Sequence, residues 1–132
     1  TLMNELKLTA QGEGYAAGTC GNLSTFSGKV FVKECLGSTG AEFSVGQLQA
    51  GEALPFTHHH KQNEEIYLVL SGTCVFTLDG HDVEAGSGTV VRVSPTVKRT
   101  LRNTGNEPLV YVCIQAREDS LQQYTMTDGV ID

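Results

Sequence analysis

Short apolar segments separated by turn residues run through most of this 132-residue chain, and they constrain its fold more than any other feature. No long stretch shows the 3.6-residue period of an amphipathic helix. Fifteen glycines fit many tight turns, because glycine reaches positive φ at no steric cost. Predicted strands cover residues 29–32, 42–48, 66–70, 74–78, 81–84, 90–93, 98–103 and 109–116. This spacing predicts an all-β sandwich, jelly roll or closed barrel in a single domain.

The strand pattern also predicts how the chain is divided. Residues 1–28 are expected to form an N-terminal segment, 29–116 the barrel, and 117–132 a tail that packs on the barrel or on a partner subunit. The Asp79-Gly80 dipeptide suits a two-residue type I′ turn and predicts a hairpin. The predicted barrel wall consists of Cys74, Phe76, Val91, Val93, Val110, Val112 and Ile114. The four cysteines contain no Cys-x-x-Cys pair, so free thiols are expected.

Charge and hydropathy exclude several kinds of partner. The net charge of −6 and the pI near 5.1 repel polyphosphates and anionic lipids, so we expect neither nucleic acid nor a membrane as partner. No apolar run approaches the roughly 18 residues of a membrane span, and no secretory signal pattern is visible, which predicts a cytoplasmic protein. One stretch of the chain carries four of the basic residues, Arg92, Lys98, Arg99 and Arg102. They are expected to form a solvated strand face, or some of them to face a pocket.

Chemistry is concentrated at His58, His60 and Glu65. On a strand, residues two apart point to the same face, so His58 and His60 are expected to point together while His59 points away. Glu65 lies on the next predicted strand and can project toward them, whereas Glu64 should face outward. Two imidazoles and one carboxylate suit a divalent transition metal with open positions, such as iron, manganese, nickel or zinc.

The same segment resembles the first motif of the cupin superfamily. Gly51 is followed by six residues to His58, then His60, four residues to Glu65 and six more to Gly72. In the second cupin motif the family has glycine, proline, glycine, histidine and asparagine in turn. The matching positions here are Gly88, Ser94, Thr96, Arg99 and Asn103. The resemblance covers residues 42–116 and implies a small single-domain cupin, a double-stranded β-helix or jelly-roll barrel, that forms a homodimer.

Arg99 stands where the family's second motif supplies a fourth metal ligand, and a protonated guanidinium cannot coordinate a cation. Two arrangements remain open. In one, His58, His60 and Glu65 bind the metal and Arg99 clamps an anionic ligand, as in an oxygenase, isomerase, decarboxylase or lyase acting on an organic acid or sugar derivative. In the other, Arg99 pairs with Glu65 or with the ligand, and the protein is a metal-free binding module.

Two further expectations concern the ligand and the dimer. Tyr67 shares the strand and the parity of Glu65, so its phenol is predicted to contact a ligand, or else to bond to the backbone. The apolar edge Val30-Phe31-Val32 is predicted to supply the homodimer contact, because pairing covers an exposed strand edge.

Overall fold

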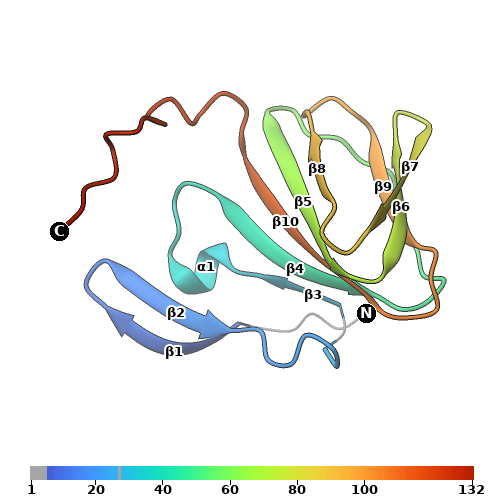
Figure 1. Cartoon of the computed structure of the whole chain (residues 1–132), viewed down its shortest axis with the longest axis horizontal. Coiled ribbons are helices and arrows are strands. Elements are labelled where there is room, and N and C mark those ends of the chain that lie inside the picture. Colours follow the sequence, from blue (N-terminus) through green and yellow to red (C-terminus); the bar gives the residue numbers. More distant parts are fainter. Residues whose placement is uncertain (1–5, 27) are drawn as a thin grey trace.

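The structure, a computed structural model, describes residues 6–26 and 28–132 (Figure 1). Its elements in chain order are β1 (Lys7–Gly12), β2 (Tyr15–Thr19), β3 (Gly28–Phe31), α1 (Lys33–Leu36), β4 (Glu42–Leu48), β5 (Asn63–Ser71), β6 (Thr73–Leu78), β7 (His81–Gly86), β8 (Val90–Val93), β9 (Arg99–Asn103) and β10 (Leu109–Arg117). A five-stranded sheet has the order β3-β4-β10-β5-β8, and a three-stranded sheet has the order β7-β6-β9. The all-β prediction is therefore confirmed.

The two larger sheets pack face to face around one core. Strand residues alternate between the two faces of a sheet, so every second residue of the paired strands enters this layer. The buried cluster between the sheets contains Leu48, Tyr67, Val69, Cys74, Phe76, Val93, Leu101, Leu109, Tyr111 and Cys113. This is the jelly-roll arrangement that the sequence predicts. In it, the inward face of β5 is turned toward the chain segment that comes just before this strand.

The Asp79-Gly80 hairpin is confirmed. Leu78 pairs with His81, and both intervening residues have positive φ, 49° for Asp79 and 80° for Gly80. Two positive φ values define the type I′ turn, whose twist matches that of the strands it joins. The cysteines are free thiols, as expected, within the part of the chain that the structure describes.

A second apolar cluster covers part of the outer face of the five-stranded sheet. Its buried members are Phe26, Val30, Val45, Val110 and Val112. Because β10 is buried on both faces, alternation does not reveal which set of its residues faces inward. The barrel-wall prediction is therefore confirmed for Val110 and Val112, which are buried core residues, and wrong for Ile114. Tyr111 and Cys113 face the core, whereas Val110 and Val112 lie on the outer face and Ile114 is 36% exposed there.

The chain termini differ from the prediction in other ways. The strands β1 and β2 pair as an antiparallel ribbon that is exposed along most of its length. Its residues show no apolar alternation from which the sequence could predict it.

The predicted dimer edge is mostly covered by the chain itself. Val30 and Val32 are buried, so only Phe31 of this edge offers an exposed side chain. Within residues 6–26 and 28–132, no helix combines the length and apolarity needed to cross a membrane.

Candidate metal centre

His58 and His60 are positioned by backbone pairing with β9 and with the turn that precedes it. The N–H of His58 donates to the Arg99 carbonyl at 3.1 Å, and the N–H of Arg99 donates back to the His58 carbonyl at 2.9 Å. Two residues later, the N–H of His60 donates to the Pro95 carbonyl at 2.8 Å. The two imidazoles therefore lie together, with ring centroids 5.1 Å apart, while His59 is exposed, as the spacing predicts.

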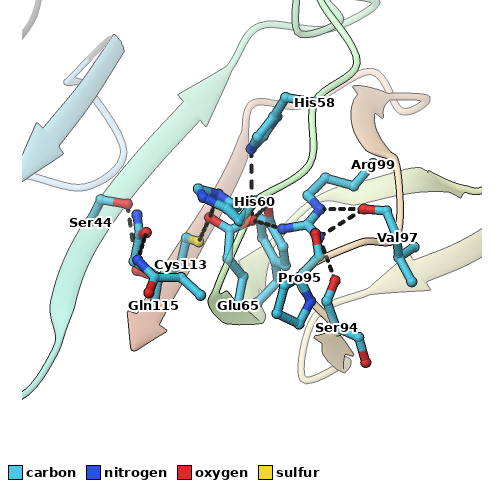
Figure 2. Close-up of polar contacts among 12 residues, drawn as sticks. Ser44, His58, His60, Glu65, Ser94, Pro95, Val97, Arg99, Cys113 and Gln115 are labelled. Atoms are coloured by element: carbon cyan, nitrogen blue, oxygen red, sulfur yellow. Dashed lines mark hydrogen bonds and ion pairs between the residues drawn. The ribbon is translucent and has the colours of Figure 1, made fainter. Parts of the chain in front are cut away.

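Glu65 enters the same space from β5 (Figure 2). Its Oε2 lies 3.4 Å from His60 Nε2, and its Oε1 lies 3.9 Å from His58 Nε2. One potential ligand atom from each of the three residues lies within 4.8 Å of the others. The neighbouring Glu64 faces outward and forms an ion pair with the exposed Arg92, as alternation predicts. The structure thus brings the predicted metal set together.

The Glu65 carboxylate is held by three donors in a buried environment. The hydroxyl of Tyr67 donates to Oε1 at 2.7 Å, Arg99 Nη1 donates to Oε1 at 2.8 Å, and the Cys113 thiol donates to Oε2 at 3.3 Å. Burial alone would raise the pKa of Glu65, but these hydrogen bonds outweigh it and lower the pKa. Glu65 is therefore an ionised carboxylate with a fixed orientation.

Arg99 is buried, with only 1% of its surface exposed. Besides the bond to Glu65, its Nε donates to the Val97 carbonyl at 3.0 Å, and its Nη2 donates to the carbonyls of Ser94, Pro95 and Val97 at 2.6, 3.0 and 2.7 Å. The turn from residue 94 to 97 wraps the guanidinium with its carbonyls (Figure 2). A planar fork of five donors suits such a cage, and lysine could not fill it.

The imidazole nitrogens provide the test of whether a metal fits this site. Among the residues that the structure describes, the buried side-chain nitrogens without a hydrogen-bond partner are His58 Nδ1 and His60 Nε2. Burial is the main cause that lowers the pKa of His58; electrostatic interactions with His60 and Arg99 lower it further, and the charge of Glu65 opposes them. The neutral imidazole is the form that ligates metals. The unsatisfied Nε2 of His60 and the Nε2 of His58, which faces the same ionised carboxylate at 3.9 Å, fit a divalent cation.

The predicted ligand contacts, Arg99 and Tyr67, both direct their polar groups at Glu65. Direct contact of either residue with a ligand stays a prediction. Sequence reasoning missed Cys113 as a donor to Glu65, because the apolar run of β10 does not show which of its residues face inward. It also missed Lys29 on β3. Burial is the largest influence on the pKa of His58 and of Cys113, and the charge of Lys29 lowers both by a smaller amount.

Comparison with known proteins supports the fold and the family. The family model described as Cupin domain matches residues 44–115. The chain is 43% identical to a cupin protein of Bacteroides fragilis whose crystal structure is known, with a TM-score of 0.76 over 80% of this chain and 90% of that chain. The fold also matches a sugar phosphate isomerase from a cupin superfamily of Silicibacter pomeroyi, at 15% identity and a TM-score of 0.61 over 71% of this chain and 68% of that chain.

A curated relative gives a shorter match. An uncharacterized protein of Methanocaldococcus jannaschii is 36% identical over 56 residues, which is 42% of this chain and 45% of that protein. The chain thus spans less than half of the length of the curated relative it matches. The family match covers more than half of the chain and includes β5 with Glu65, and the Bacteroides protein is similar over most of both chains. The chain belongs to the cupin family.

Proposed function

We propose that this cupin binds a divalent transition metal, iron, manganese, nickel or zinc, through His58, His60 and Glu65, and a small anionic organic ligand beside it. The observation that carries the proposal is that His60 Nε2, buried and without a hydrogen-bond partner in the described residues, lies 3.4 Å from the ionised carboxylate of Glu65, while His58 Nε2 faces the same carboxylate at 3.9 Å. Three protein ligands leave open positions for a ligand, the arrangement found where metals take part in chemistry.

The chain's own residues hold the carboxylate in place. Arg99 and Tyr67 both donate to Oε1 of Glu65, which fixes the carboxylate and leaves Oε2 facing His60. When bound, the metal would act as a Lewis acid toward an oxygen ligand, which suits oxygenase, isomerase or decarboxylase types of reaction on a small organic acid. The second N–H of Arg99 Nη1 is the donor through which Arg99 could also reach a ligand.

Cobalt(II) provides a direct test of this function. We expect one Co²⁺ to bind metal-stripped protein with a visible absorption spectrum, and oxalate to change that spectrum because it fills the open positions. His60→Ala should weaken Co²⁺ binding by more than about 100-fold, because it removes one of only three protein ligands. The exposed His59→Ala is the matched control and should bind Co²⁺ as the native protein does. A Co²⁺ spectrum that oxalate leaves unchanged would contradict the proposed open site.

The Arg99–Glu65 ion pair favours a second candidate, a metal-free module that binds a small anion. The positive charge at Oε1 weakens the attraction of Glu65 for a second cation, and at 2.8 Å the pair is complete without a metal. The cobalt experiment separates the two candidates. Oxalate binding to a native protein that takes up no Co²⁺ would support the metal-free module and exclude the metal centre.

We propose that the protein assembles as a homodimer through the outer face of the five-stranded sheet. Phe43, Ile114 and Ile66 pair directly across β4, β10 and β5, and each is at least 36% exposed. Beyond β10, the tail (residues 118–132) extends away from the barrel (Figure 1). It carries apolar side chains that are 76–99% exposed, Leu121, Tyr124, Met126, Val130 and Ile131. A second copy related by a two-fold axis would cover both features reciprocally.

Replacing Ile114 by lysine is expected to convert the dimer to a monomer in light scattering, because a charge would be buried at the centre of the contact. Val83→Lys is the matched control, since Val83 is 39% exposed on β7 of the other sheet. This variant should remain dimeric. A native protein that is monomeric at high concentration would refute the assembly without affecting the metal centre.

A further inference from the structure

Lys29 stands on the same face of the five-stranded sheet as Glu65. Residues that pair directly across antiparallel strands share a face. Lys29 pairs with Gly46, Gly46 with Tyr111, and Tyr111 with Val69 on β5. Val69 and Glu65 are four residues apart on one strand, so their side chains point to the same side. Lys29 is thus on the inward face, although it lies on the edge strand.

The Lys29 side chain leans toward the end of the sheet that carries Glu65. Its ammonium lies 5.1 Å from the ring centroid of Phe31, two residues further along β3. Phe31 belongs to the inward row that reaches Tyr67 on β5, and the next row reaches Glu65. In Figure 1, β3 and β4 lie on the side of the large sheet away from β6, β7 and β9.

The charge of Lys29 has no partner of its own. In the part of the chain that the structure describes, no carboxylate lies within 4.0 Å of its ammonium, and the residue is half-buried. The ammonium nevertheless points along the sheet toward the site. Phe31, over whose ring it lies, pairs with Ser44, and Ser44 pairs with Cys113, whose thiol donates to Glu65. An unpaired cation beside a metal set is a natural anion contact.

Arg99 leaves this role open. Four of its five N–H groups are accounted for by Glu65 and by three carbonyls of residues 94–97, and its exposed fraction is 1%. Lys29 has three donors on a flexible stem, and no carboxylate among the described residues neutralises it. Of the two basic residues on the inward side, Lys29 is therefore the one able to move onto a ligand.

We propose that Lys29 binds the distal carboxylate of a small dicarboxylate whose other carboxylate is held at His58, His60 and Glu65. This inference rests on the proposed function and adds to it a class of ligand and a residue that selects it. A monocarboxylate would use the metal centre alone. A dicarboxylate would gain a charge-assisted hydrogen bond from Lys29 as well.

Titration of Co²⁺-loaded protein with malonate, succinate and acetate tests this assignment. We expect at least one dicarboxylate to bind the native protein more tightly than acetate does. Lys29→Met should weaken that dicarboxylate about tenfold and leave acetate unchanged, whereas Lys29→Arg should retain most of the gain. Lys33→Met is the matched control, because it removes the same charge from the neighbouring helix α1. All variants should take up Co²⁺ as the native protein does.

The outcomes separate this inference from the proposed function. If Co²⁺ binds but Lys29→Met holds the dicarboxylates as tightly as the native protein, or if Lys33→Met weakens them equally, the role of Lys29 is refuted and the metal centre stands. If Co²⁺ does not bind, the metal centre is refuted. The same titrations are then repeated on metal-free protein. Dicarboxylate binding that Lys29→Met weakens would support the role of Lys29, and the absence of dicarboxylate binding would refute it.

Discussion

Replacing Arg99 by alanine is expected to lower the free energy of unfolding by about 3–5 kcal/mol. Arg99 is buried and is the cationic partner of Glu65, which is itself only 4% exposed. The substitution would leave a buried carboxylate without its counter-ion and remove the guanidinium donor from the carbonyls of Ser94 and Val97. Chemical denaturation at neutral pH measures the change.

Arg102 provides a matched control on the same strand. It forms an ion pair with Asp82 at 3.2 Å, but it is exposed, so Arg102→Ala should change stability by less than about 1 kcal/mol. The double variant with Glu65→Gln and Arg99→Met should be more stable than Arg99→Ala, because no charge is left buried. An Arg99→Ala protein as stable as Arg102→Ala would show that the guanidinium is not held as described.

The effect of Arg99→Ala should also depend on pH. The pKa of Glu65 is lowered in the folded protein, so its ionised form contributes stability above the pKa of the unfolded chain, and this contribution is lost as the pH falls through the folded pKa. The stability difference between native and Arg99→Ala protein should therefore be full at neutral pH. It should narrow below the ordinary glutamate pKa of about 4.3.

Much of the site could be predicted because it depends on local parity. His58 and His60 are two residues apart, and Glu64 and Glu65 are neighbours. Because successive side chains of a strand point to opposite faces, this spacing alone separates the inward residues from the outward ones. The His-x-His spacing to Glu65 also belongs to the first cupin motif, which this chain retains in full. The turn at Asp79-Gly80 followed from the same kind of local rule.

The environment of Arg99 could not be predicted in this way. Its position opposite His58 follows from a cross-strand pair, but the choice between a ligand and Glu65 depends on where the carbonyls of Ser94, Pro95 and Val97 point. The directions of the carbonyl groups in an irregular turn cannot be predicted from the sequence. The predicted alternatives stayed open at that residue for this physical reason.

Long-range pairing set the remaining limits. The strand β10 has neighbours on both sides and is buried on both faces, so its apolar run gave no sign that Cys113 rather than Val112 faces Glu65. Lys29 reaches the inward face only through pairing of β3 with β4, which are separated by α1. Neither contact produces a periodic pattern of apolar residues in its own segment, so the sequence of that segment alone could not predict it.

The largest expected loss concerns the metal itself. In protein purified without a histidine tag, elemental analysis should find about one transition-metal ion per chain, bound by three protein ligands. His58→Ala and His60→Ala should each lose nearly all of it, because each removes a nitrogen that has no other partner among the described residues. His59→Ala should retain the metal, since its exposed ring lies outside the cluster.

This measurement shows directly whether two half-buried imidazoles and the fixed Glu65 carboxylate form a metal centre despite the arginine beside it. We expect metal in the native and His59→Ala proteins and almost none in His58→Ala and His60→Ala. Native protein that binds no metal, even after incubation with iron, manganese, nickel or zinc, would contradict this expectation. So would metal lost equally from His59→Ala.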